Sequence, residues 1–220
     1  MQSDRDAALA LFPLPQEVVR RLDIYAELLR KWQKTINLVA NSTLPHLWTR
    51  HIADSLQVQA AVPEAKLWAD LGSGGGFPGL VTAIRLAETP RARVHLIESD
   101  QRKCAFLREV SRETSAPAIV HNARIEQVVD HLGEPIEAVS ARALAPLPVL
   151  LAYAENLLAE GAIGVFLKGQ EADQEIKALS AAGRYRIIEK SSITASSSRL
   201  LLVFDRAAED RRGAADEFGA

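Results

Sequence analysis

Cysteine, net charge and long apolar runs are all scarce in this chain. Its 220 residues include one cysteine, Cys104, which allows no internal disulfide and no cysteine metal cluster and favours a reducing compartment. The formal net charge is −2, so contact with nucleic acid requires a local basic patch and not an overall basic field. Residues 1–14 have the pattern of neither a signal peptide nor a membrane span. We therefore expect a cytoplasmic protein with no membrane partner.

Hydrophobic residues, by contrast, make up 48% of the chain, enough to bury a sizeable core. Apolar side chains that recur every three or four residues predict amphipathic helices over residues 16–36 and 43–60. We expect residues 1–62 to form a helical cap, residues 63–206 to form the main domain, and the charged, small residues in 207–220 to form a flexible tail.

From residue 66 onward the pattern alternates between strands and helices. We predict strands at residues 66–71, 93–98, 118–121, 136–141 and 162–168, with helices at 79–88, 101–113, 125–132, 146–159 and 172–181. This order implies an α/β fold in which a parallel sheet has helices on both faces. Residues 184–189 and 199–205 form two further strands with no helix between them, so they must be antiparallel. Such a terminal hairpin is typical of methyltransferase sheets and not of dinucleotide-binding sheets.

Five glycines follow the first predicted strand, at positions 72, 74, 75, 76 and 79. They let the backbone turn sharply and leave no side chain between the peptide groups and a bound cofactor. Two spacings compete: the G-x-G-x-x-G of dinucleotide sites, and G-x-G-x-G starting at Gly72. Asp70 stands two residues before Gly72, which gives the D-x-G-x-G-x-G order of a methyltransferase first motif. Glu98 ends the second strand, where its carboxylate can accept hydrogen bonds from ribose hydroxyls in either type of site.

Three basic residues lie near the ends of strands, where parallel sheets bind ligands. Arg142 follows the fourth strand, at the place where amine-methylating enzymes have Asn-Pro-Pro-Tyr or Asp-Pro-Pro-Tyr, which this chain lacks. Lys168 ends the fifth strand, and we interpret it as a phosphate contact; the alternative is a solvated lysine. Arg124 precedes a predicted helix and is either an RNA contact or a salt-bridge partner.

Six short motifs, at residues 32–38, 50–56, 72–79, 124–126, 140–143 and 167–169, together resemble one family. They include Trp-Gln-Lys-Thr-Ile-Asn-Leu, Arg-His-Ile-Ala-Asp-Ser-Leu and Leu-Lys-Gly. Over residues 32–204 the chain is similar to the small-subunit ribosomal RNA guanine-N7 methyltransferases, also called the glucose-inhibited division protein B family. The resemblance implies a Rossmann-like class I S-adenosylmethionine-dependent methyltransferase fold. Its seven-stranded sheet would be mostly parallel, with an antiparallel C-terminal hairpin and an N-terminal helical cap.

The resemblance also implies a reaction. The enzyme would transfer the methyl group of S-adenosylmethionine to N7 of a guanosine in the 530 loop of 16S ribosomal RNA. Its substrate would be the RNA or a small-subunit assembly particle. Independently of the resemblance, we expect a monomer that holds no metal. Guanine N7 has an in-plane lone pair and no proton, so the reaction requires no general base, and the cofactor supplies the electrophile. A nicotinamide-dependent oxidoreductase and a non-catalytic RNA-binding assembly factor remain as alternatives.

The expected site is spread over the loops that follow the strands. The residues expected to bind the cofactor are Asp70, Gly72, Gly74, Gly76, Phe77, Glu98, Ile125, Glu126 and Arg142. Arg142 and Lys168 are expected to act in catalysis, and both are expected to contact RNA together with Arg124. His51 and Asp54 share a helical turn with Ser55, but one histidine and one carboxylate make a poor metal site. The resemblance implies that these three residues connect the cap to the cofactor domain.

Overall fold

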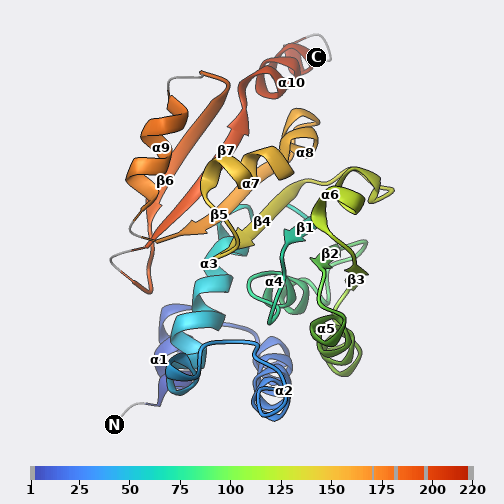
Figure 1. Ribbon diagram of the computed structural model, residues 1–220, viewed down its shortest axis with the longest axis vertical. Helices are drawn as coiled ribbons and strands as arrows, with labels where there is room; N and C mark the ends of the chain where they lie inside the picture. The colour runs from blue at the N-terminus through green and yellow to red at the C-terminus, as the bar shows by residue number, and fades with distance from the viewer. Residues whose placement is uncertain (1–2, 170, 181–182, 196–197, 218–220) are drawn as a thin grey trace.

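A seven-stranded sheet forms the centre of the protein (Figure 1). The computed structural model describes residues 3–169, 171–180, 183–195 and 198–217. The strands are β1 (Leu67–Leu71), β2 (Arg93–Glu98), β3 (Ala118–Asn122), β4 (Ala138–Arg142), β5 (Ile163–Lys168), β6 (Tyr185–Ser191) and β7 (Arg199–Asp205). Their spatial order is β3-β2-β1-β4-β5-β7-β6. β1 to β5 pair in parallel, whereas β7 runs antiparallel to both β5 and β6, which confirms the predicted sheet and its terminal hairpin.

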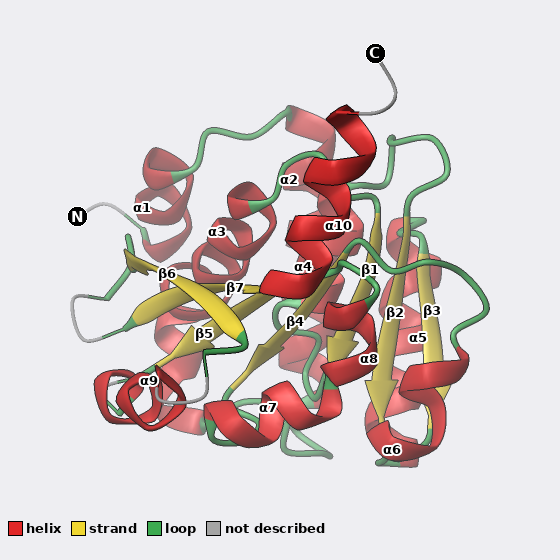
Figure 2. Cartoon of the chain, turned by 90° about the horizontal axis from the view of Figure 1, so that it is seen from above, coloured by secondary structure: helices red, strands yellow, loops and turns green. Residues whose placement is uncertain are grey.

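Helices cover both faces of the sheet (Figure 2). The helices of the sheet domain are α4 (Gly79–Arg85), α5 (Gln101–Thr114), α6 (Ile125–Val128), α7 (Leu147–Tyr153), α8 (Glu155–Ala159) and α9 (Ala172–Ser180). Side chains of the strands alternate between two hydrophobic clusters: Leu96 of β2 belongs to the cluster that contains α4 and α5, and its neighbour Ile97 belongs to the cluster that contains α6, α7 and α8. Because both faces are covered, the carboxyl ends of the parallel strands are where a ligand can approach.

Two predicted helices are interrupted in the structure. The helix predicted over residues 125–132 is α6 followed by a 3-10 turn, η3 (Val129–His131). The helix predicted over residues 146–159 breaks at Ala154 into α7 and α8. Leu150, Ala154 and Leu157 are all buried, so the apolar spacing runs through the break and gives no sign of it.

The N-terminal cap differs from its prediction. Its elements are α1 (Asp4–Leu11), α2 (Gln16–Trp32), η1 (Asn41–His46), η2 (Trp48–Ala53) and α3 (Asp54–Ala61). The single helix predicted over residues 43–60 is wrong, because η1 is a 3-10 helix that contains Pro45, η2 is a π-helix, and only α3 is α-helical. α1, which the sequence did not predict, is tied to η2 because the Asp4 carboxylate accepts a hydrogen bond of 2.7 Å from the Trp48 backbone N–H.

The cap and the sheet domain share one hydrophobic cluster. Leu22 and Tyr25 of α2 are buried with Ile84 of α4 and Phe106 of α5. At the end of α2, the indole Nε1–H of Trp32 donates to Glu109 of α5 at 2.9 Å. The cap, drawn in blue to cyan in Figure 1, is therefore packed directly on α4 and α5, the helices that follow β1 and β2.

The expected C-terminal tail is helical over most of its length, as α10 (Arg206–Glu217), and residues 218–220 lie outside the described part. Ala208 is buried, and the Arg211 guanidinium donates to the Ala159 carbonyl at 2.6 Å. The charged and small residues of this segment indicated a flexible tail, but these contacts join the first half of α10 to α8 and β7. No helix in the described residues has the length and apolar character that crossing a membrane requires.

Candidate functional site

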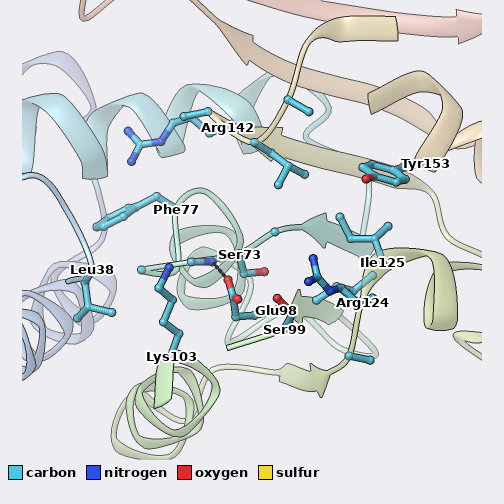
Figure 3. A pocket seen from close by; sticks show the side chains of 18 of the residues that line it. Leu38, Ser73, Phe77, Glu98, Ser99, Lys103, Arg124, Ile125, Arg142 and Tyr153 are labelled. Carbon is cyan, nitrogen blue, oxygen red and sulfur yellow. Dashed lines mark hydrogen bonds between the residues drawn. The ribbon is translucent and has the colours of Figure 1, made fainter. Parts of the chain in front are cut away.

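A cleft of about 460 Å³ opens at the carboxyl ends of β1, β2 and β4 (Figure 3). It is lined by Leu38, Gly72, Ser73, Gly74, Gly75, Phe77, Ile97, Glu98, Ser99, Lys103, Ala123, Arg124, Ile125, Glu126, Arg142, Ala143, Leu144, Ala145 and Tyr153. Seven of the nine residues predicted to bind the cofactor lie in this wall, and so does Arg124. Residues from four separate segments of the sequence therefore meet at one site, as expected for a parallel sheet.

The glycine loop is packed too closely for side chains at two positions. Gly72 has a φ of +65°, and a Cβ there would stand 2.5 Å from Leu144. A Cβ at Gly75 would stand 2.9 Å from the backbone carbonyl oxygen of Leu38, which belongs to the cap. The loop therefore presents its peptide groups to the cleft, which fits a cofactor held by backbone groups.

The cap fixes this loop from behind. The buried hydroxyl of Tyr25 in α2 donates to the Gly75 carbonyl oxygen at 2.5 Å. Phe77 packs between Tyr25 and His51, with ring centroids 5.2 and 5.0 Å away. Tyr25 falls in an ordinary apolar pattern and Leu38 ends the motif at residues 32–38, and only the folded cap brings the two residues to the glycine loop.

Glu98 is positioned as a ribose-binding carboxylate requires. It accepts hydrogen bonds from the backbone N–H groups of Gly74, at 2.9 Å, and Asp100, at 2.8 Å. The bond from Gly74 joins the end of β2 to the glycine loop, as Figure 3 shows, and the two bonds together fix the carboxylate in the wall of the cleft. Each carboxylate oxygen has two lone pairs, so the group can accept further hydrogen bonds from vicinal hydroxyls.

Glu126 and Tyr153 face the cleft on the side of α6 and α7. The hydrogen bond from the Tyr153 hydroxyl to the Glu126 carboxylate raises the pKa of Tyr153. The apolar side chain of Ile125 lies beside them, and Arg124 contributes a cation to the same wall (Figure 3). This combination of an apolar wall and fixed polar atoms suits a heterocyclic base. Tyr153 is a further residue that sequence reasoning missed.

Arg142 lies in the wall next to the cap. Its guanidinium donates to Nδ1 of His51 at 2.6 Å and to the Arg50 carbonyl oxygen at 3.1 Å, and Asp54 Oδ2 is 3.7 Å from it. The guanidinium also lies over the Phe77 ring, 5.2 Å from the centroid. Burial lowers the pKa of Arg142, and it lowers the pKa of His51 to about 3. Burial raises the pKa of Asp54 to about 6.

Three predicted site residues do not line the cleft. Asp70 is completely buried beneath the loop, where its Oδ1 accepts from the Ser140 hydroxyl at 2.7 Å and burial raises its pKa to about 6. Gly76 packs against Leu80 and Tyr25. Lys168 pairs with Glu175 and donates to the carbonyl of Ala145.

The site roles predicted for these three residues therefore stay predictions. In this structure Asp70 lies beneath the glycine loop, Gly76 packs within it, and Lys168 contacts the loop after β4. Lys103 of α5 also lines the cleft, although it belongs to none of the six motifs. Within the described residues no cluster of histidine, cysteine and carboxylate side chains has the geometry of a metal site.

The sheet order, the glycine loop and the acidic residue at the end of β2 define a class I S-adenosylmethionine-dependent methyltransferase. Solved structures agree on the fold. An O-methyltransferase from Bacillus cereus, in complex with S-adenosylhomocysteine, has a TM-score of 0.60 at 13% identity and covers 93% of this chain and 98% of its own. A putative O-methyltransferase from Klebsiella pneumoniae has a TM-score of 0.62 at 15% identity, over 93% of this chain and 97% of its own.

Within that class, the chain belongs to the rRNA small subunit methyltransferase G family, whose model matches residues 18–202. Ribosomal RNA small subunit methyltransferase G of Nitrobacter winogradskyi is 52% identical over 96% of this chain and 76% of its own length. The protein of the same name from Parvibaculum lavamentivorans is 54% identical over 79% of this chain and 76% of its own. The family resemblance seen in the motifs is thereby confirmed.

Proposed function

We propose that this protein transfers a methyl group from S-adenosylmethionine to N7 of a guanosine in the 530 loop of 16S ribosomal RNA. The observation that carries the proposal is the 52% identity, over 96% of this chain, with a protein named for methylation of small-subunit ribosomal RNA. The substrate is the RNA itself or a small-subunit assembly particle. Such a substrate places the enzyme in the cytoplasm, and we infer that it acts as a monomer.

The cofactor residues have distinct parts in this proposal. Glu98 accepts hydrogen bonds from the ribose hydroxyls, the peptide groups around Gly72 and Gly74 hold the amino acid portion, and Ile125 with Glu126 receives the adenine. Bound S-adenosylmethionine supplies an electrophilic methyl group on its sulfonium. The protein therefore has to place a nucleophile in line with that methyl group and exclude water from it.

Arg142 and Arg124 are the cations that we assign to the RNA. Guanine N7 attacks through its own lone pair, so a hydrogen bond to N7 would block the reaction. Arg142 instead donates to guanine O6 or to a neighbouring phosphate, which fixes the base without occupying N7. Since N7 has no proton to lose, none of the carboxylates near the cleft is needed as a base, and positioning can lower the barrier by about 7–11 kcal/mol.

The target nucleotide must leave its stack, or be presented by an incompletely assembled particle, before it can enter the cleft. Small-subunit particles and 16S RNA that lack the modification are incubated with the protein and cofactor labelled in the methyl group. Borohydride reduction followed by aniline cleavage then maps N7-methylguanosine. We expect one labelled guanosine, in the 530 loop. Label at another position or atom, or no transfer to either substrate, would refute the proposal.

A further inference from the structure

The Arg142 guanidinium is connected to the cap by a short chain of hydrogen bonds that starts at His51. Arginine only donates, so Nδ1 of His51, 2.6 Å from Arg142, must be an acceptor without a proton. The other ring nitrogen, Nε2, lies 2.8 Å from Oγ1 of Thr43, which itself donates to the Ala40 carbonyl at 2.7 Å. His51 Nε2–H therefore donates to Thr43. The contacts on both sides of the ring specify one neutral tautomer.

The π-helix η2 makes this contact possible. In a π-helix the backbone bonds span five residues, and one extra residue is accommodated per turn, a feature that is frequent at functional sites. Here η2 directs the Arg50 carbonyl oxygen and the His51 side chain toward the Arg142 guanidinium. Each of the two accepts a hydrogen bond from it. The His51 carbonyl in turn accepts from the Ser55 hydroxyl at 2.7 Å, which holds the backbone of η2 against α3.

The charges around His51 favour the same arrangement. An imidazolium would be buried and would face the Arg142 guanidinium and the Arg50 side chain, and the repulsion from these two cations exceeds the attraction from Asp4. Asp54, the nearest opposite charge to Arg142, accepts from Thr194 in the β6–β7 loop and from Gln57, and so is itself fixed. Neutral His51 can accept from Arg142 without adding another cation to this largely buried cluster.

His51 does not itself line the cleft, whereas Arg142 does. Arg142 has five N–H donors, of which the described contacts with His51 and the Arg50 carbonyl use two. We propose that His51 is a positioning residue whose neutral Nε2–H tautomer holds the Arg142 guanidinium at the cleft wall, with its remaining donors available to the target guanosine. This inference rests on the proposed function, because that function gives Arg142 its ligand.

Two substitutions separate positioning from packing. His51→Asn keeps an acceptor close to the position of Nδ1, whereas His51→Phe keeps the ring that packs on Phe77 but removes the acceptor. We expect kcat for RNA methylation to fall about 10- to 100-fold in His51→Phe, which corresponds to the loss of one hydrogen bond to a charged group. In His51→Asn we expect kcat to stay much closer to the wild-type value, because the acceptor is kept. The Kd of S-adenosylhomocysteine should change less than about threefold in both variants. The control is His46→Asn, a substitution of an exposed histidine, which should leave kcat unchanged.

A role in packing alone predicts the opposite order, with His51→Phe the more active variant, and that result would overturn the proposal. Equal activity of His51→Phe and the wild type would overturn it as well. Nitrogen-15 NMR of the wild-type protein supplies a readout that needs neither RNA nor a variant. It should show His51 with an unprotonated Nδ1 and a protonated Nε2, and a protonated Nδ1 would refute the inference whatever the enzyme methylates. Absence of transfer by the wild type would instead refute the proposed function.

Discussion

The Lys168 ammonium lies 2.8 Å from a carboxylate oxygen of Glu175, which joins the end of β5 to α9. The same Glu175 oxygen accepts from the backbone N–H of Leu147, and Lys168 also donates to the carbonyl oxygen of Ala145. The two side chains therefore hold the end of the loop between β4 and α7 that leads into α7. This loop includes Leu144, which packs over Gly72 of the glycine loop.

Lys168→Met should lower stability and leave the RNA contact unchanged. Removal of the ammonium leaves the mostly buried Glu175 unpaired, and we expect a loss of about 1–3 kcal/mol in the free energy of unfolding, measured with urea. The double variant Lys168→Met, Glu175→Gln should recover part of that loss. If Lys168→Met keeps its stability but raises KM for the RNA, the residue contacts RNA as its sequence position suggested.

Glu98→Gln should weaken cofactor binding without unfolding the protein. The amide keeps one acceptor oxygen but loses the charge and one of the acceptors that hold Gly74 and Asp100. We expect the Kd of S-adenosylhomocysteine, measured by calorimetry, to rise about 10- to 100-fold, the range for hydrogen bonds to a charged group. Glu113→Gln, at an exposed position of α5, is the matched control and should leave the Kd unchanged.

Arg142→Ala should abolish most methyl transfer while the cofactor still binds. The substitution removes the donors that we assign to the target guanosine, so kcat for RNA methylation should fall at least about 100-fold. The Kd of S-adenosylhomocysteine tests whether the cofactor site survives. Transfer at the wild-type rate would remove Arg142 from the reaction, and a lost cofactor affinity would assign it to the cofactor instead.

Gly75→Ala tests the contact between the glycine loop and the cap. The added methyl group would lie 2.9 Å from the Leu38 carbonyl oxygen, and because that atom belongs to the backbone, the loop or the cap must move. We expect a loss of about 1–3 kcal/mol in stability, from overpacking, and weaker cofactor binding. At Gly169 a Cβ would meet nothing within 4 Å, so Gly169→Ala should change neither measurement. Equal effects at the two positions would contradict the assigned contact.

Asp54→Asn should change how stability depends on pH. Burial raises the Asp54 pKa from 3.8 to about 6 in the folded protein, so the folded state favours the protonated form and loses stability as pH rises through this range. The asparagine does not titrate. The free energy of unfolding of the variant, minus that of the wild type, should therefore increase by about 2 kcal/mol between pH 4 and pH 7.

Asp100 provides a control of opposite sign. Its pKa is lowered by hydrogen bonds from the backbone N–H groups of Lys103 and Arg102, so its carboxylate stabilises the folded state and that stability is lost as pH falls. The free energy of unfolding of Asp100→Asn, minus that of the wild type, should therefore decrease as pH rises. A shift in the same direction for both variants would show that the trend does not come from these carboxylates.

The sequence predicted the sheet because each buried strand is a short apolar run between turn residues, and the terminal strands have no room for a crossover helix. It also predicted residues that meet in one cleft, since Gly72, Glu98 and Arg142 all stand near strand ends, and parallel strands bring their ends together. It did not predict the 3-10 and π segments of the cap, because Leu44, Trp48 and Ile52 keep a helical spacing in either geometry.

Local sequence alone thus determined the fold class, the glycine loop and the presence of charged groups near it. Tertiary structure decided which of those groups face the cleft, because their partners lie far away in the chain. Lys168 is engaged by Glu175 and Asp70 by Ser140, while Lys103 and Tyr153 reach the cleft from helices that carry no motif. A side chain's role depends on whether a partner from another segment satisfies its charge and hydrogen bonds, and spacing along the sequence does not contain that information.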